Sequence, residues 1–396
     1  MKAGWKVKTL GDVCEIINGG TPKSAVSEFW GGGVQWLTPK DMGKLEGHYI
    51  SETPRTITDI GLAKCSARLV PSNSLIMSTR APIGHLAINT APMAFNQGCR
   101  GLVPSNSLAL KFLFYWMSAN VPALNDLGTG TTFKELGAGA LRNFTIPLPP
   151  LEEQKQIVTV LDAAFEGLTR ARTHIETNLQ NARELFESVL QHSFSQTESW
   201  ETAELNEHVK FVDYRGKTPP KRPQGVRLIT AKNVKRGYIQ RNPEEFIDAD
   251  AYEGWMTRGF PEKGDVLFTT EAPLANVALL DTDEKVVIGQ RLITMKANKT
   301  ILDHAFLAFA LMSPQMQEKI ISQGTGATVL GIKAKLLKVI PLHFPKSLTE
   351  QRDIAKRCRE ASENMEELQS IFNKKLQDLD DLRQSLLQKA FAGELT

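Results

Sequence analysis

The sequence has few of the features that mark exported or membrane proteins. Its four cysteines are scattered and form no Cys-x-x-Cys pair, which argues against a disulfide framework or a zinc site and fits a reducing cytoplasm. The first residues contain no apolar stretch typical of a signal peptide. The longest apolar runs, such as residues 112–117, are far too short to span a bilayer. We therefore expect a cytoplasmic protein.

The sequence also lacks the motifs on which several classes of enzyme depend. It contains no GxxxxGK[ST] loop for ATP and no GxGxxG that opens a helix after a strand. It has no Asn-Pro-Pro-aromatic tetrad to hold a flipped adenine, and no PD…[DE]xK arrangement in a suitable strand. Its seven histidines show no metal-ligand spacing. We therefore expect no catalytic residue, no metal site and no cofactor in this chain.

The most informative feature that is present is an internal repeat, which should be sought before any other pattern. IPLPPLEEQKQIV at residues 146–158 is echoed by IPLHFPKSLTEQRDIA at residues 340–355. Further pairs follow the same order in both halves, among them SLIMSTRAPIG and DVLFTTEAPLA, and LGTGTT and QGTGAT. Matches in one order indicate a tandem duplication, in which each half is a globular module followed by a long helix.

The repeat predicts an α+β fold with two tandem-duplicated α/β domains, at residues 1–150 and 200–346. Two long antiparallel coiled-coil helices, at residues 151–199 and 347–396, would separate these domains around a pseudo-twofold axis. Each helix of about 44 residues would be roughly 66 Å long and act as a spacer. Two unrelated amphipathic helices, each packed on its own module, remain an alternative.

The coiled coil is predicted because apolar residues in both helices step by alternating intervals of four and three. The predicted seam contains Ile157, Leu161, Leu168 and Ile175 in the first helix and Ile354, Met365, Leu368, Leu379 and Leu386 in the second. The same spacing continues through Leu185 and Leu382 and places Asn178 and Lys375 at seam positions. These two polar residues either set the register of the coiled coil or lie where the seam is solvated.

The charges are distributed unevenly along the chain, although the net charge is only +3. Residues 1–150 carry a net charge of +5 and residues 200–346 carry +4, whereas residues 151–199 carry −4 and residues 347–396 carry −2. Basic modules joined by acidic helices are the pattern expected of a nucleic-acid reader with an inert spacer.

The strongest basic segment is residues 214–241, YRGKTPPKRPQGVRLITAKNVKRGYIQR, which contains no acidic residue. Its prolines and glycines predict a loop from which side chains reach a groove, where Lys and Arg neutralise phosphates and Arg binds guanine edges. We predict DNA contacts for Arg215, Lys217, Lys221, Arg222, Arg227, Lys232, Lys235 and Arg236. The matching stretch of the first module offers Lys23, Lys40 and Lys44. A solvated basic loop without a ligand is the alternative.

Two turns give further candidates. The Gly-Thr turns GTGTTFK (128–134) and GTGAT (324–328) could bind a phosphate through converging backbone N–H groups, with Thr131, Thr132 and Lys134 as contacts, or could be plain turns. Arg80 in STRAPIG and Glu271 in TTEAPLA each precede Ala-Pro after a strand. They could read different bases, since Glu accepts from cytosine, or be strand-end surface residues.

Taken together, these motifs resemble the specificity subunit of type I restriction-modification systems. The resemblance covers essentially the whole chain, and IPLPPLEEQ followed by the heptads is its most specific part. It implies a non-catalytic DNA-specificity subunit with two target recognition domains, each reading one half of a bipartite DNA site. The two domains differ in detail, so we expect an asymmetric site with half-site centres about 10 bp apart.

The resemblance also implies partners. The helices would dock two modification subunits, which bind S-adenosylmethionine and methylate adenine, and ATP- and Mg-dependent restriction subunits would join that core. The sequence HFPK at residues 343–346, where the first copy has two prolines, leaves the angle at which the second helix begins undetermined. A scaffold that binds only protein partners is the alternative, against which the basic modules count.

Overall fold

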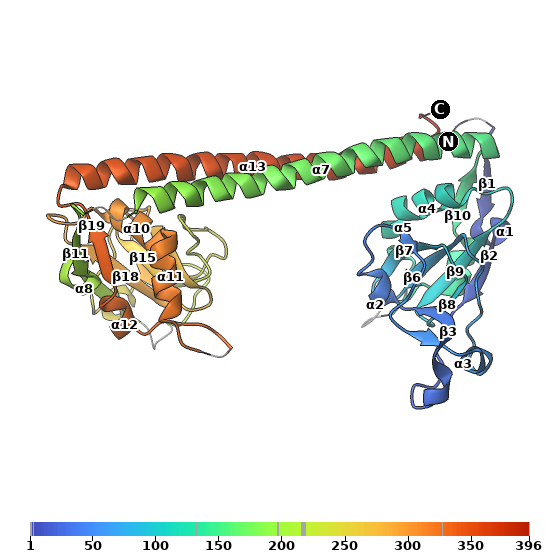
Figure 1. Ribbon diagram of the computed structural model, residues 1–396, viewed down its shortest axis with the longest axis horizontal. Coiled ribbons are helices and arrows are strands. Elements are labelled where there is room, and N and C mark those ends of the chain that lie inside the picture. Colours follow the sequence, from blue (N-terminus) through green and yellow to red (C-terminus); the bar gives the residue numbers. More distant parts are fainter. Residues whose placement is uncertain are drawn as a thin grey trace. The chain divides into compact units, whose positions relative to one another are not determined.

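The computed structural model describes residues 2, 4–130, 134–195, 198–214, 219–326 and 328–395. The chain forms two compact units, unit 1 with Met1–His174 and Lys375–Thr396, and unit 2 with Ile175–Lys374. Each unit holds one globular domain and a part of each of two long helices, α7 (Leu151–Ser193) and α13 (Leu348–Ala392), which are green and red in Figure 1. Both helices therefore contribute residues to both units.

The domain of unit 1 is built on two sheets with mixed pairing. The larger sheet has the order β2 (Cys14–Asn18), β9 (Cys99–Pro104), β6 (Ser74–Thr79), β7 (Ile83–Asn89) and β4 (Tyr49–Ile50). The smaller sheet has the order β5 (Thr56–Ile57), β3 (Trp30–Leu37) and β8 (Met93–Phe95). A ladder of β1 (Lys6–Thr9) and β10 (Thr145–Leu148) lies next to the start of α7. The helices are α1 (Leu10–Val13), α2 (Pro39–Met42), α3 (Asp59–Ala63), α4 (Leu110–Ala119), α5 (Val121–Asp126), α6 (Ala138–Asn143) and the 3-10 turn η1 (Ser27–Phe29).

The domain of unit 2 repeats this topology. Its larger sheet has the order β12 (Val209–Asp213), β18 (Leu292–Ala297), β15 (Val266–Thr270) and β16 (Leu274–Leu279). Its smaller sheet has the order β14 (Phe246–Ile247), β13 (Val226–Ile229) and β17 (Val286–Ile288), and β11 (Glu201–Glu204) pairs with β19 (Pro341–Phe344). The helices are α8 (Leu205–His208), α9 (Tyr252–Trp255), α10 (His304–Met312), α11 (Pro314–Ser322) and α12 (Ala334–Lys338). The matching strand orders confirm the predicted tandem duplication and the α+β fold.

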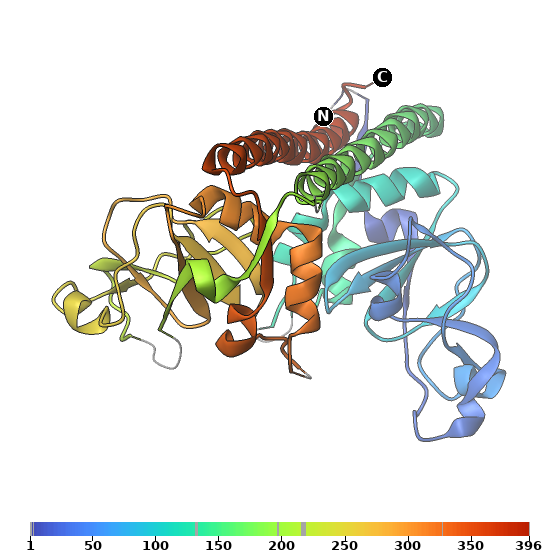
Figure 2. The same cartoon turned by 60° about the vertical axis from the view of Figure 1, so that its left-hand side comes forward.

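Each domain packs against the long helices through one short apolar helix. In unit 2, α10 (orange in Figure 2) has an almost wholly buried sequence and shares a core with the larger sheet and with Phe186 and Leu190 of α7. In unit 1, α4 occupies the same place, and the ring of Phe112 lies 5.3 Å from that of Phe391 in α13. The long helices are thus part of the core of each domain as well as partners of one another.

The repeated Glu-Gln pair explains why both helices begin alike. Gln154, the fourth residue of α7, is fully buried; its Oε1 accepts from the Ala109 N–H at 2.8 Å, and its Nε2 donates to the carbonyls of Ser107 and Pro149, both at 2.9 Å. The amide therefore ties the loop before α4 to the turn before α7. Because buried polar groups must find partners, this position requires a side chain with both a donor and an acceptor.

The second copy forms the same clamp. Gln351, the fourth residue of α13, is also fully buried and accepts from the Asp303 N–H at 2.8 Å. Its Nε2 donates to the carbonyls of Ile301 and Pro345, at 2.9 and 2.7 Å. Pro345 thus takes the place of Pro149, and the different sequence around it leaves the start of the second helix tied to its domain in the same way.

The two long helices pair antiparallel. In unit 1, the guanidinium of Arg383 lies 4.4 Å from the centre of the Phe165 ring, and about two turns further along α7 Arg172 forms an ion pair with Asp380. The partner residue number falls as the α7 number rises, so the chains run in opposite directions. In unit 2, Phe186 and Leu190 of α7 share a core with Ile354 and Cys358 of α13.

Each heptad has two predicted seam positions. One of them is confirmed along both helices, whereas the other is confirmed only in the first heptad of each, at Ile157 and Ile354. Ile157, Leu161 and Ile354 are buried, and Leu168, Ile175, Met365, Leu379 and Leu386 are partly buried, as predicted. Beyond the first heptad, the residue buried at the second seam position is the one that follows the predicted residue. In most heptads of α7 this following residue is a bulkier apolar side chain, which buries more surface than the predicted one. Phe165, Leu179 and Phe186 take these places in α7, and Gln369 and Leu376 take them in α13.

The prediction is therefore wrong for Leu368, which is 39% exposed, and for Leu185 and Leu382, which are 65% and 47% exposed. Asn178 and Lys375 are also exposed, so neither is a buried polar residue of the seam. In the described part of the chain, every helix is too short or too polar to be a membrane span.

Candidate nucleic-acid interface

In unit 2 the Ala-Pro turn and the Gly-Thr turn, predicted as separate candidates, lie side by side. The backbone N–H of Thr270, the last residue of β15, donates to the carbonyl of Arg291 at 2.8 Å, and the Ile332 N–H donates to the carbonyl of Thr270 at 2.9 Å. Within the Gly-Thr turn, Thr325 and Gly331 exchange two backbone hydrogen bonds, of 2.8 and 3.0 Å. This frame of hydrogen bonds holds Glu271 between the two loops.

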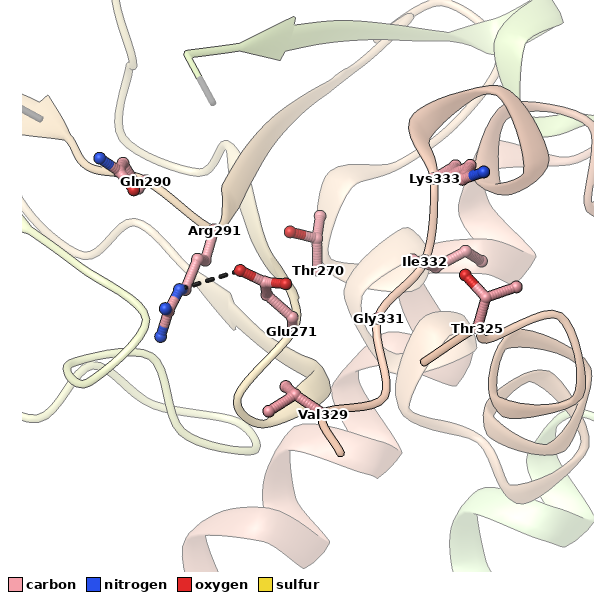
Figure 3. Close-up of a pocket in the computed structure, with 9 residues that line it drawn as sticks. All are labelled: Thr270, Glu271, Gln290, Arg291, Thr325, Val329, Gly331, Ile332 and Lys333. Carbon is pink, nitrogen blue, oxygen red and sulfur yellow. Dashed lines mark ion pairs between the residues drawn. The ribbon is translucent and has the colours of Figure 1, made fainter. Parts of the chain in front are cut away.

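These loops line a shallow pocket, shown in Figure 3. Arg291 Nε lies 2.9 Å from Glu271 Oε1, and both side chains are about half exposed, at 53% and 43%. Gln290, which precedes Arg291, and Lys333, which follows the turn, complete the polar part of the lining. The ion pair holds Arg291 and Glu271 in place, while about half of each side chain stays exposed to solvent. Charged groups of this kind are suited to bind a polar ligand.

The basic segment borders the same place. A second pocket shares Gln290 and Arg291 with the first and is also lined by Lys221 and Lys232. We define Lys221, Lys232, Glu271, Gln290, Arg291 and Lys333 as the recognition surface of unit 2. These side chains include four cations and one carboxylate. With Glu245, which lines the second pocket and pairs with Lys221, the cations still outnumber the carboxylates by two, so the surface is suited to an anionic ligand.

The basic segment is less positive in space than in sequence, because acids from other loops neutralise part of it. Lys221 Nζ lies 2.7 Å from Glu245, and Arg241 pairs with Asp281 at 3.4 Å. Arg236 binds Glu187 of α7 at 2.7 Å and the Met312 carbonyl at 2.7 Å. Arg236 therefore lies in a structural contact between its domain and α7 rather than in the recognition surface.

Three other residues predicted from this segment make hydrogen bonds within their own domain. Arg227 donates to the carbonyl of Arg241, the backbone of Arg222 bonds to that of Phe246, and Lys235 lies in a small backbone turn. The DNA contacts predicted for these three residues stay predictions. Arg215 and Lys217 lie outside the described residues.

Unit 1 has the same backbone frame around the end of β6. The Thr79 N–H donates to the Gly98 carbonyl at 2.8 Å, the Leu136 N–H donates to the Thr79 carbonyl at 2.9 Å, and Thr129 and Glu135 exchange hydrogen bonds of 3.0 and 2.8 Å. Arg80, which follows Thr79, has its Nη1 3.8 Å from Glu135 Oε2.

The remaining candidates of unit 1 surround this frame less closely. Gln97, next to Gly98, accepts a hydrogen bond from the hydroxyl of Thr21 in the GGTP segment. Lys134 is exposed beside the Gly-Thr turn, whereas Thr131 and Thr132 lie outside the described residues. Lys23, Lys40 and Lys44 are exposed, on the loop before η1, in α2 and directly after α2.

Two arginines, Arg55 and Arg291, were not predicted from the sequence. Arg55 stacks on the rings of Trp30 and Trp36, at 4.0 and 5.1 Å from their centres, a contact that joins residues too far apart for a local pattern. Arg291 occupies the place of Gly98, and the mismatch was visible in the repeat once Gln97 and Gln290 are aligned.

A cluster of ionisable groups between α4 and α7 in unit 1 has a structural explanation. Lys111 Nζ lies 2.6 Å from Asp162, and the hydroxyl of Tyr115 donates to the same carboxylate. Burial and this hydrogen bond raise the pKa of Tyr115 well above its ordinary value, so the phenol stays protonated. Among the described residues, no three metal-ligating side chains lie together.

Comparisons with known proteins agree with this geometry. The protein family described as "Type I restriction modification DNA specificity domain" matches residues 2–181 and 198–370. The MjaIX type I restriction enzyme specificity subunit of Methanocaldococcus jannaschii is 25% identical, over 99% of this chain and 93% of the relative. The EcoKI specificity subunit of Escherichia coli K12 is 22% identical, over 99% and 89%.

Solved structures share the fold. A chain from a structure of type I R-M system complex assembly and conformational transition aligns with a TM-score of 0.78 at 20% identity, covering 100% of this chain and 99% of that one. The HsdS subunit of Thermoanaerobacter tengcongensis aligns with a TM-score of 0.57 at 19% identity, covering 100% and 98%.

Proposed function

Because the chain belongs to the family of type I restriction-modification DNA specificity domains, we propose that it is the DNA sequence-specificity subunit of a type I restriction-modification complex. Each globular domain reads one half of a bipartite DNA site. The chain itself is a non-catalytic component that acts on DNA together with other subunits of the complex. Its modules are basic and its helices acidic, which suits a protein whose domains contact phosphates.

One observation carries the assignment of a split, asymmetric site. The two domains hold the same backbone frame at the ends of β6 and β15, yet they place their charged side chains at different positions around it. Arg80 directly follows the strand in unit 1, whereas Glu271 stands there in unit 2 and Arg291 lies on the neighbouring segment. Since base identity is read by side chains at groove edges, equal frames with unequal side chains predict two different half-sites.

The partners and cofactors belong to the same proposal. We infer that two modification subunits dock on the long helices, bind S-adenosylmethionine and methylate adenine in each half-site. Restriction subunits that use ATP and Mg would join this core, and the complex would act in the cytoplasm. The long helices, which carry the repeated glutamine clamp at the start of each copy, are the part that sets the gap between half-sites.

The deciding experiment is co-expression with the neighbouring modification subunit, followed by single-molecule sequencing of host DNA for methyladenine. Methylation at one split motif, with a constant gap of unspecified bases, is the expected result. If a complex forms and no motif is methylated, the specificity function is refuted, and a protein scaffold without DNA readout becomes the better explanation.

A further inference from the structure

The backbone frames of the two domains define three equivalent positions around the end of the central strand. Gly98 and Arg291 are equivalent because each gives its carbonyl to the last strand residue, and Glu135 and Gly331 are equivalent because each precedes the residue that donates to that strand. The third position directly follows the strand and is occupied by Arg80 and Glu271.

The side chains at these positions are exchanged between the units. Unit 1 has its arginine directly after the strand and its carboxylate, Glu135, on the Gly-Thr turn, with Nη1 and Oε2 3.8 Å apart. Unit 2 has its carboxylate, Glu271, directly after the strand and its arginine, Arg291, on the neighbouring segment, with Nε and Oε1 2.9 Å apart. Both arrangements present one arginine beside one carboxylate.

Of the three positions, the one that holds neither member of the pair is glycine in each unit, Gly98 in unit 1 and Gly331 in unit 2, and the pair leaves little space there. A Cβ added to Gly98 would lie 3.0 Å from Nε of Arg80, and a Cβ added to Gly331 would lie 3.1 Å from Cβ of Glu271. Both distances are shorter than ordinary van der Waals contacts. The two units thus reach the same pairing by two different placements, and a side chain added at either glycine would require the pair to shift by a few tenths of an ångström.

The backbone at Arg291 indicates that the side chain is retained for function rather than for folding. Arg291 has a φ of 67°, in the left-handed region that costs a non-glycine residue roughly 1 kcal/mol or more. Glycine adopts this region without that cost. Gly98, at the equivalent position in unit 1, does not have a positive φ, so the left-handed conformation belongs to unit 2 alone. The fold alone would therefore favour glycine at position 291.

The geometry of the pair leaves the terminal edge of the guanidinium to act on a ligand. Glu271 contacts Nε of Arg291, and the edge that carries Nη1 and Nη2 points away from Glu271 (Figure 3). That edge matches O6 and N7 of guanine in the major groove. Lys221 and Lys232 border the same surface and are placed to contact phosphates.

We propose that Arg80 in unit 1 and Arg291 in unit 2 each read one guanine, one in each half-site of the DNA. Glu271, which contacts Nε, is a positioning residue that orients the guanidinium of Arg291. Glu135 lies 3.8 Å from Nη1 of Arg80, too far for a hydrogen bond, so it attracts Arg80 by charge and leaves the terminal nitrogens able to bind guanine. This inference deepens the proposed function and rests on it. It also changes the role predicted for Glu271, which holds an arginine instead of accepting a hydrogen bond from cytosine.

The test uses the complete complex with its modification subunit and compares Arg291→Gly and Arg80→Ala with wild type. In Arg291→Gly the preference for guanine at one position of one half-site should fall about 5- to 150-fold, which corresponds to roughly 1–3 kcal/mol for a bidentate contact. Arg80→Ala should relax the other half-site. The gap should stay the same in both variants, and Arg291→Gly should be at least as heat-stable as wild type.

Two variants provide matched controls. Arg68 pairs with Glu15 at 3.0 Å and Lys263 pairs with Asp283 at 2.8 Å, and both cations are more than half exposed. Arg68→Ala and Lys263→Ala therefore remove a similar exposed ion pair and should leave the motif unchanged. Glu271→Gln, which keeps an acceptor for Nε, should retain more of the guanine preference than Glu271→Ala if Glu271 acts by positioning.

A binding measurement covers the case in which a variant no longer methylates. Duplexes with single 7-deazaguanines lack the N7 acceptor, and the wild-type complex should lose affinity at one guanine in each half-site. Arg291→Gly should be insensitive to that substitution in its own half-site. If wild type methylates a split motif but tolerates every 7-deazaguanine, or if both arginine variants keep the motif, this inference is refuted while the proposed function stands. A wild-type complex without any motif would refute the proposed function itself.

Discussion

The glutamine clamp at the start of α7 allows a stability prediction whose size follows from the structure. Replacing Gln154 by Met keeps the length of the side chain but removes the amide. The variant loses the three hydrogen bonds to Ala109, Ser107 and Pro149. At about 1 kcal/mol net for each, the free energy of unfolding of unit 1 should fall by roughly 3 kcal/mol. For a unit of this size, that corresponds to a decrease in Tm of roughly 6–12 °C.

The assay is differential scanning calorimetry combined with hydrogen exchange. Gln156→Met is the matched control, because Gln156 is exposed on the same helix and its replacement should change stability by less than about 0.5 kcal/mol. Exchange should accelerate in peptides that contain Ala109, whereas peptides around Asp303, held by the second clamp, serve as an internal reference.

Two results would refute the reasoning. If Gln154→Met and Gln156→Met are equally stable, the buried amide contributes nothing, and the repeated Glu-Gln pair has another cause. If Gln154→Met is destabilised but exchange near Ala109 is unchanged, the loss arises from packing at the helix and not from the hydrogen bonds of the clamp.

Three further predictions follow from the same structure. Phe186→Ala, at a buried seam position, should lower the free energy of unfolding by about 3–5 kcal/mol, and Leu185→Ala by less than about 0.5 kcal/mol; equal losses in urea denaturation would contradict the observed seam. Burial raises the pKa of Cys14 and Cys99 to about 12, so the folded chain holds their protons more tightly than the unfolded chain, whose thiols titrate near pH 8.5. Their contribution to the free energy of unfolding is present below about pH 8.5 and is lost as the pH rises toward 12. A Cys14→Ala, Cys99→Ala double variant should therefore lose less stability than wild type between about pH 8.5 and 11. If the free energy of unfolding changes equally with pH in both proteins, the result would count against the burial of these thiols. One heptad added to each long helix, near Asn178 and near Lys375, lengthens each helix by about 10 Å, which is the length of roughly three base pairs. The gap in the methylated motif should widen, while both half-sites keep their bases. Altered bases with an unchanged gap would show that the helices do not act as the spacer.

The sequence alone was sufficient for the duplication, the fold class and the family, because these depend on patterns that repeat along the chain. IPLPPLEEQ and IPLHFPKSLTEQ recur because each helix start needs the same buried amide, and a chemical requirement of that kind is visible in residue identity. The heptad spacing was visible for the same reason, since one side of each helix must be apolar wherever it is buried.

The seam and the recognition surfaces were decided by the tertiary structure. Ala164 and Phe165, or Asn178 and Leu179, are adjacent on the helix, and only the packing of the two helices determines which member is buried. The basic segment looked free of acids because Glu245, Glu187 and Asp281 lie elsewhere in the sequence and meet it only in space.

The arginine–carboxylate pairs show the same limit most clearly. Arg80 and Glu271 are aligned in sequence, yet the residue that lies beside a carboxylate as Arg80 does is Arg291, which stands at the position of a glycine. Sequence determines which side chains are available at each position, whereas ion pairing depends on distances between loops that are far apart along the chain. Only the folded backbone frame brings those loops together.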